Sequence, residues 1–69
     1  MNITSEFFNQ FIDIVSNDNY GETVYTTRFK NEGYEIFIKS CCYFVIRDLQ
    51  NNGFCMDMCS TGLHVWKTE

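Results

Sequence analysis

The residues most able to do chemistry gather in one short segment of the chain. Positions 54–66 have the sequence FCMDMCSTGLHVW, with two of the four cysteines, the only histidine and the only tryptophan. Thiolate, imidazole and carboxylate groups are zinc ligands and also the components of nucleophilic active sites. Their spacing must distinguish a metal site, a thiol active site and an ordinary pair of β-strands.

The spacing of the cysteines argues against a metal site. Zinc-binding cysteines usually lie about two to four residues apart on a tight turn. Cys55 and Cys59 lie in a segment with strand-like alternation, where four residues span about 13 Å. The two thiolates cannot share one tetrahedral ion at that distance, nor form a disulfide, which needs Cα atoms about 4.4–6.8 Å apart. The neighbours Cys41 and Cys42 would point to opposite faces of a strand. We therefore predict free thiols, no metal and no cofactor.

A thiol active site is the alternative that this segment leaves open. A two-residue Thr61-Gly62 turn would set Cys59 opposite His64, with about 5 Å between their Cβ atoms, and Asp57 would lie two residues along the strand. A nucleophilic active site also needs oxyanion donors and a pocket that excludes water. The sequence has no glycine-rich phosphate loop and no G-x-S-x-G or H-E-x-x-H motif. We predict a non-enzymatic protein and keep a Cys59/His64 thiol or metal enzyme as a lesser alternative.

Residues 4–17 have the apolar periodicity of an amphipathic helix. Thr4 or Ser5 can cap its first turn, and the turn-forming residues 16–21 (SNDNYG) can end it. Apolar side chains recur at intervals of three and four residues and make one stripe. The stripe consists of Phe7, Phe8, Phe11, Ile12 and Val15.

From residue 22 onward the apolar period changes to two, and β-branched and aromatic residues dominate. Short turns that contain glycine separate strands predicted near 22–30, 34–40, 42–50, 54–60 and 63–68. Residues 39–42 carry no turn signal, so the second and third strands could also be one long bent strand. We predict an α+β fold, with an N-terminal helix packed on one face of a four- to five-stranded antiparallel meander sheet. Residues 1–69 would form a single compact domain.

The predicted turns also give a register and two sheet faces. A loop at residues 30–33 pairs Phe29 with Tyr34, and a loop at residues 51–53 sets Arg47 opposite Asp57. One face of the last three strands is then almost entirely apolar, and we expect the helix to cover it. That face consists of Phe44, Ile46, Phe54, Met56, Met58, Leu63 and Val65.

The opposite face has the composition of a protein-binding patch. It would hold Tyr43, Arg47, Asp57, His64 and Trp66, and a few aromatic and arginine side chains carry most of the binding energy in protein interfaces. We predict these five residues as a partner-binding site. A plain solvated surface, or burial of the face in a homodimer, would satisfy the same pattern.

The charge of the chain favours some partners over others. A net charge of −4, with five Lys and Arg residues spread along the sequence, argues against direct binding of nucleic acid, which needs a clustered basic surface. An acidic surface suits a basic protein. A second, weaker candidate site is the acidic cluster Asp13, Asp18 and Glu22, which could attract a basic or nucleic-acid-binding protein. Neither a secretory signal nor a membrane-spanning apolar run is present, so we expect no membrane contact and a cytoplasmic location.

No motif in the chain matches a known family. In size, acidity and lack of catalytic motifs, the chain is similar to small bacteriophage proteins that inhibit host factors, including anti-CRISPR and other counter-defence proteins. This resemblance is one of composition. It implies a small acidic inhibitor or regulator of a host protein, which acts in the host cytoplasm if the chain is phage-encoded. The alternative is a small homodimeric structural protein.

Overall fold

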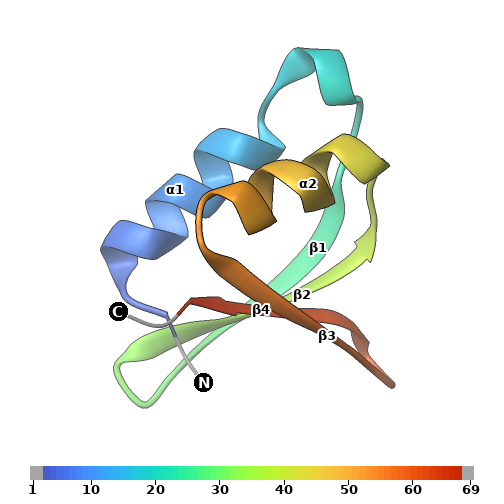
Figure 1. Ribbon diagram of the computed structural model, residues 1–69. Coiled ribbons are helices and arrows are strands. Elements are labelled where there is room, and N and C mark those ends of the chain that lie inside the picture. The colour runs from blue at the N-terminus through green and yellow to red at the C-terminus, as the bar shows by residue number, and fades with distance from the viewer. Residues whose placement is uncertain (1–2, 68–69) are drawn as a thin grey trace.

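Two helices lie on one face of a four-stranded antiparallel sheet in the computed structural model, which describes residues 3–67 (Figure 1). The α+β fold is therefore confirmed, with an N-terminal helix packed on an antiparallel sheet. Thr68, the last residue of the predicted final strand, lies outside the described residues. The elements are α1 (Ser5–Val15), the 3-10 helix η1 (Asp18–Tyr20), β1 (Val24–Lys30), β2 (Gly33–Ser40), α2 (Tyr43–Asn51), β3 (Phe54–Cys59) and β4 (Gly62–Lys67).

Helix α1 agrees with the helix predicted over residues 4–17. Thr4 is the N-cap, and its side-chain oxygen accepts a hydrogen bond from the backbone N–H of Phe7 at 3.4 Å. Glu6 lies in the first turn, where its negative charge faces the positive end of the helix dipole. Phe11 and Val15 are the buried members of the apolar stripe. The stripe thus positions α1 against the sheet, as its spacing predicted.

The β1–β2 hairpin has the predicted register. Phe29 lies opposite Tyr34, and Arg28 lies opposite Glu35, with 2.6 Å between the Arg28 guanidinium and the Glu35 carboxylate. Asn31 and Glu32 form the turn with φ angles of 55° and 62°. Positive φ at both central residues is the mark of a type I′ turn, which matches the twist of the two strands.

The strand predicted at residues 42–50 is wrong, because Tyr43–Asn51 forms helix α2. Val45 and Leu49, one helical turn apart, are both buried, so the segment buries one side of a helix rather than alternate residues. Gly53 follows the helix with a φ of 88°, a left-handed conformation that suits glycine at a helix C-terminus. The aromatic and β-branched residues at 43–46 favour a strand locally, but burial of Val45 and Leu49 overrides that preference.

Helix α2 also changes the order of the strands, which is β1-β2-β4-β3 rather than the sequential order of a meander. Strands β2 and β3 are both antiparallel to β4, so they run parallel to each other on either side of it. Parallel strands need a crossover connection, and a helix is its usual form. This topology therefore requires a crossover between β2 and β3, and α2 lies in it.

The β3–β4 hairpin turns at Ser60-Thr61 instead of at the predicted Thr61-Gly62. As a result Cys59 pairs with Gly62, and His64 pairs with Asp57. The difference from the predicted register amounts to two residues, which leaves every side chain on its predicted face.

The core lies between the sheet and the two helices. It contains aliphatic and aromatic side chains from every strand except β1 and from both α-helices. Its buried residues are Ile3, Phe11, Val15, Ile36, Ile38, Val45, Leu49, Phe54 and Val65. Within residues 3–67, no helix has the length and apolar character needed to cross a membrane.

Candidate protein-binding surfaces

The sheet face that points away from the helices carries a row of aromatic rings. On β4, Val65 is buried in the core, so its neighbours His64 and Trp66 point to the opposite side of the sheet. Phe37 on β2 lies directly opposite His64, and Asp57 on β3 lies opposite it on the other side. We call Phe37, Asp57, His64 and Trp66 the outer sheet face. Among residues 3–67, no helix lies over this face (Figure 1).

The rings of the outer sheet face contact one another. The ring centroids of Phe37 and His64 are 4.9 Å apart, and their planes differ by 22°. The centroids of His64 and Trp66 are 5.4 Å apart. The Nε2 atom of His64 is enclosed and has no hydrogen-bond partner within residues 3–67. The face is thus a continuous aromatic strip with an imidazole held between two larger rings.

The five predicted partner-binding residues separate into two groups. Asp57, His64 and Trp66 come together on the outer sheet face. Tyr43 and Arg47 lie on α2, in the helical layer on the other side of the sheet (Figure 1). The expectation of one shared face depended on the strand predicted at 42–50, and it is wrong for Tyr43 and Arg47 because that segment is a helix.

Sequence reasoning missed Phe37 as a member of this surface. The predicted strand at 34–40 already contained the signal, because Ile36 and Ile38 flank Phe37 and alternate residues point to opposite faces. Both isoleucines are buried in the core. Alternation alone therefore assigns Phe37 to the uncovered side.

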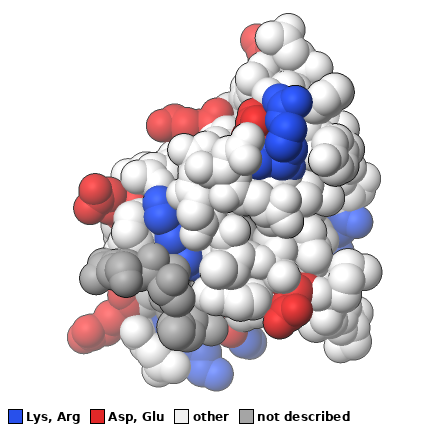
Figure 2. Space-filling view, in the orientation of Figure 1, with Lys and Arg blue, Asp and Glu red and all other residues white. Residues whose placement is uncertain are grey.

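A second group of aromatic residues surrounds the first turn of α2. Tyr43 and Phe44 are 70% and 48% exposed. The Arg47 guanidinium lies 4.8 Å from the centre of the Phe44 ring, and the Tyr20 ring stacks on Phe44 at 5.8 Å. We call Tyr20, Tyr43, Phe44 and Arg47 the α2 patch. In Figure 2 the surface over α2 is mainly uncharged, apart from a basic and an acidic group side by side between α2 and η1.

Tyr20 and Asp48 join η1 to α2 through a hydrogen bond. The Tyr20 hydroxyl donates to Asp48 Oδ2 at 2.5 Å, and the Arg47 guanidinium donates to Asp48 Oδ1 at 3.2 Å. The hydrogen bond from Tyr20 holds the pKa of Asp48 below its ordinary value, and the same bond raises the pKa of Tyr20.

This pair predicts a pH dependence of folding stability. A carboxylate with a lowered folded-state pKa stabilises the fold above its unfolded-state pKa of about 3.9 and loses that contribution as the pH falls through the folded value. We expect Asp48→Asn to destabilise the protein at neutral pH and the difference from wild type to shrink on acidification. Urea unfolding midpoints measured between neutral pH and strong acid test this. Glu35→Gln on β2 is a second example of the same effect, because Arg28 also lowers the pKa of Glu35, and its difference from wild type should shrink on acidification in the same way. A difference for Asp48→Asn that stays constant with pH would contradict the assignment.

The predicted Cys59–His64 pair does not form. The Cys59 thiol lies 3.1 Å from Thr61 Oγ1 and donates to the Gly62 carbonyl at 3.1 Å, and the hydrogen bond with Thr61 lowers the pKa of the thiol. All four cysteines are free. Within residues 3–67, no three His, Cys, Asp or Glu side chains are grouped closely enough to hold a metal ion. The geometry on which a Cys59/His64 enzyme depended is therefore missing.

The acidic cluster predicted as a weaker site is spread over three segments. Asp13 lies on α1, Asp18 begins η1 and Glu22 lies between η1 and β1. All three residues are exposed. No hydrogen bond or ion pair joins these described carboxylates to other residues, so they remain a general source of negative charge near one end of α1.

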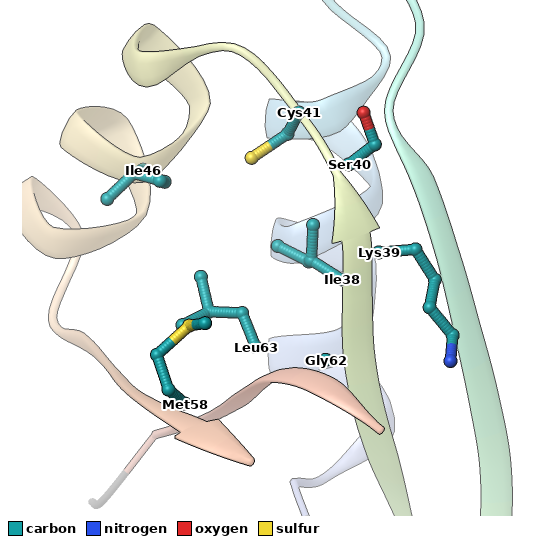
Figure 3. Close-up of a pocket in the computed structure, with 8 residues that line it drawn as sticks. All are labelled: Ile38, Lys39, Ser40, Cys41, Ile46, Met58, Gly62 and Leu63. Atoms are coloured by element: carbon teal, nitrogen blue, oxygen red, sulfur yellow. The ribbon is translucent and has the colours of Figure 1, made fainter. Parts of the chain in front are cut away.

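An apolar hollow of about 270 Å³ opens between α2 and the β3–β4 hairpin. In Figure 3, Ile46, Met58 and Leu63 point toward the hollow, whereas Lys39 points away from it. Small-molecule sites usually have volumes of about 300–1,000 Å³ and bring a few polar groups together to orient the ligand. The side chains that point into this hollow are aliphatic or contain sulfur, so it offers apolar contact without such orientation.

Comparison with family models, with curated proteins and with solved structures found no significant match to this chain. The two surfaces are therefore interpreted from their own chemistry.

Proposed function

We propose that this chain is a non-enzymatic protein-binding module that inhibits or regulates a partner protein, with the outer sheet face as its binding surface. The observation that supports this most is that the rings of Phe37, His64 and Trp66 contact one another in a row on a face that no helix within residues 3–67 covers. Aromatic side chains supply large, rigid contact area at a small cost in conformational entropy, and they are enriched among residues that dominate binding energy.

The charge of the chain supports a basic partner protein. The net charge of −4 steers a basic partner toward the chain and disfavours direct contact with nucleic acid. On the outer sheet face, Asp57 is exposed and lies opposite His64, the middle ring of the aromatic row, where it can pair with a cation of the partner. In this proposal the chain acts in the cytoplasm, as a counter-defence type of inhibitor does.

A double variant tests the outer sheet face. We expect Phe37→Ala/Trp66→Ala to weaken binding by about 2 kcal/mol or more, because anchor side chains at the centre of an interface have effects of that size. Affinity capture from the native host's lysate at low and moderate salt would identify the partner. Titration calorimetry with the purified partner would then measure the loss.

Tyr43→Ala is the matched control, because it removes an aromatic ring that is more exposed but lies on α2. We expect this variant to bind like wild type, with circular dichroism confirming that both variants are folded. If Tyr43→Ala abolished binding and the double variant did not, the α2 patch would be the binding surface. Full binding by both variants would reject both surfaces.

A further inference from the structure

Strand β1 is an open edge of the sheet. Its seven residues, Val24–Lys30, pair with β2 on one side, and within residues 3–67 no strand pairs with them on the other. An open edge presents unpaired N–H and C=O groups that another strand can bind. The chain contains no proline to block such pairing.

The hydrogen bonds of Tyr34 show which groups of β1 point outward. The backbone N–H and C=O of Tyr34 both bond to Ile3, at 2.8 and 2.9 Å, so they point away from β1. Phe29 is the residue opposite Tyr34, and in such an antiparallel pair the backbone groups of both residues point away from each other. Because the pattern repeats every second residue, the backbone groups of Tyr25, Thr27 and Phe29 face outward.

We propose that β1 of a second copy of this chain pairs with β1 in antiparallel orientation, about a two-fold axis at Thr27. This register places Thr27 opposite Thr27 of the second copy and Tyr25 opposite its Phe29. The three outward-facing positions of each strand then form hydrogen-bonded pairs with the three of the other. Each pair exchanges two N–H···O bonds, so the contact makes about six bonds.

The side chains of β1 match this register. Phe29 is 63% exposed and would pack against Tyr25 of the second copy, an aromatic cross-strand pair that stabilises antiparallel sheets. On the other face, Arg28 of each copy is already neutralised by Glu35 at 2.6 Å. The two arginines that approach each other near the axis therefore belong to ion pairs, which reduces their repulsion.

The other edge, β3, fits a second copy less well. Leu63 and Val65 of β4 pair with β2 through Ile38 and Ile36, so the backbone groups of His64 face β3. By the same alternation, the outward-facing positions of β3 are Phe54, Met56 and Met58. Phe54 is only 3% exposed because its side chain lies in the core, so a register about Met56 gains no exposed aromatic side chain like that of Phe29 for a cross-strand pair.

Pairing at β1 would join the two sheets into one of eight strands. A two-fold axis perpendicular to the sheet keeps both pairs of helices on one side, so both outer sheet faces lie together on the other side. The dimer would present the aromatic row twice. Dimerisation does not depend on the proposed function and can be tested without the partner.

Thr27→Pro tests the dimer. Proline removes the N–H of residue 27, which in the wild type points away from β2. The β1–β2 hydrogen bonds are therefore kept, because edge strands tolerate proline at such positions. We expect light scattering at high concentration to give twice the 8.2 kDa mass of the chain for wild type and 8.2 kDa for Thr27→Pro. Met58→Pro is the matched control, because it places proline at an outward-facing position of the other edge, and it should remain dimeric.

Hydrogen exchange on the wild type provides a second measurement that does not depend on the folding of any variant. In the dimer, the Thr27 amide is protected as strongly as its neighbours Thr26 and Arg28, and its protection increases with protein concentration. A wild-type mass of 8.2 kDa at all concentrations, or fast exchange at Thr27, would overturn the proposal. A dimer that survives Thr27→Pro but not Met58→Pro would assign the contact to β3 instead.

Discussion

Leu49→Ala is expected to lower the free energy of unfolding by about 2–5 kcal/mol, the range for removing a large buried aliphatic side chain. The Leu49 side chain is 0% exposed and anchors the last turn of α2 in the core that also contains Val45. Truncation removes apolar contacts and leaves a cavity that the packed surroundings fill only in part. Because small domains have total stabilities of only about 5–15 kcal/mol, this loss would be a large share of the whole.

The stability of Phe44→Ala distinguishes helix α2 from the strand predicted at the same residues. In a strand at 42–50, Phe44 would face the core and Leu49 would face solvent. In α2, Phe44 is 48% exposed, so its truncation should cost clearly less than that of Leu49. Urea unfolding of the two variants, each with wild type measured alongside, gives the order of the two losses. A larger loss for Phe44→Ala would show that residues 43–51 do not form this helix.

The elements that sequence predicted correctly are those in which local preference and tertiary packing agree. In α1, the stripe through Phe11 and Val15 has helical spacing, and Thr4 supplies the cap. In the β1–β2 hairpin, alternation and a short turn set one register, which places Arg28 opposite Glu35. Each of these signals lies within about ten residues, so no distant contact was needed to find it.

Helix α2 could not be found in the same way, because its local signals conflict. The residues Tyr43, Phe44, Val45 and Ile46 prefer strands, whereas the spacing of Val45 and Leu49 and the glycine at 53 favour a helix. Only the core decides between these preferences, since Val45 and Leu49 are both fully buried there. The predicted strand order was wrong for the same reason, because a strand at 42–50 leaves no crossover helix between β2 and β3.

Only part of the candidate site was predicted correctly, and the reason is related. A two-residue error in the β3–β4 register preserves the face of every side chain, so Asp57, His64 and Trp66 were placed together correctly. The same error sets wrong cross-strand neighbours, and the predicted Cys59–His64 pair was lost with it. The sheet face on which a side chain lies is predicted more reliably than its cross-strand neighbour. The face depends only on whether the residue is an even or odd number of positions along the strand, whereas the neighbour depends on the exact register.

Gly62→Ala is expected to destabilise the protein by about 1–3 kcal/mol, the usual range for overpacking a well-packed position. A Cβ atom at Gly62 would lie 2.7 Å from the backbone oxygen of Ile38, closer than such atoms approach. Gly62 also has a φ of 130°, a conformation that residues with a side chain rarely adopt. Because the obstacle is backbone in the buried β2–β4 pair, it cannot rotate away, and the β3–β4 hairpin must shift.

Gly21→Ala is the control that isolates the clash. Gly21 also has a positive φ, of 73°, but a Cβ atom there would have no other atom within 4 Å, so this variant carries backbone strain without contact. Urea unfolding should therefore show a larger loss for Gly62→Ala than for Gly21→Ala. We also expect Gly62→Ala to change the near-ultraviolet circular dichroism of Trp66, because the shift of β4 against β2 moves His64 away from Phe37. Equal losses and an unchanged spectrum would mean that β4 does not approach Ile38 this closely, and the aromatic row would lose its geometric basis.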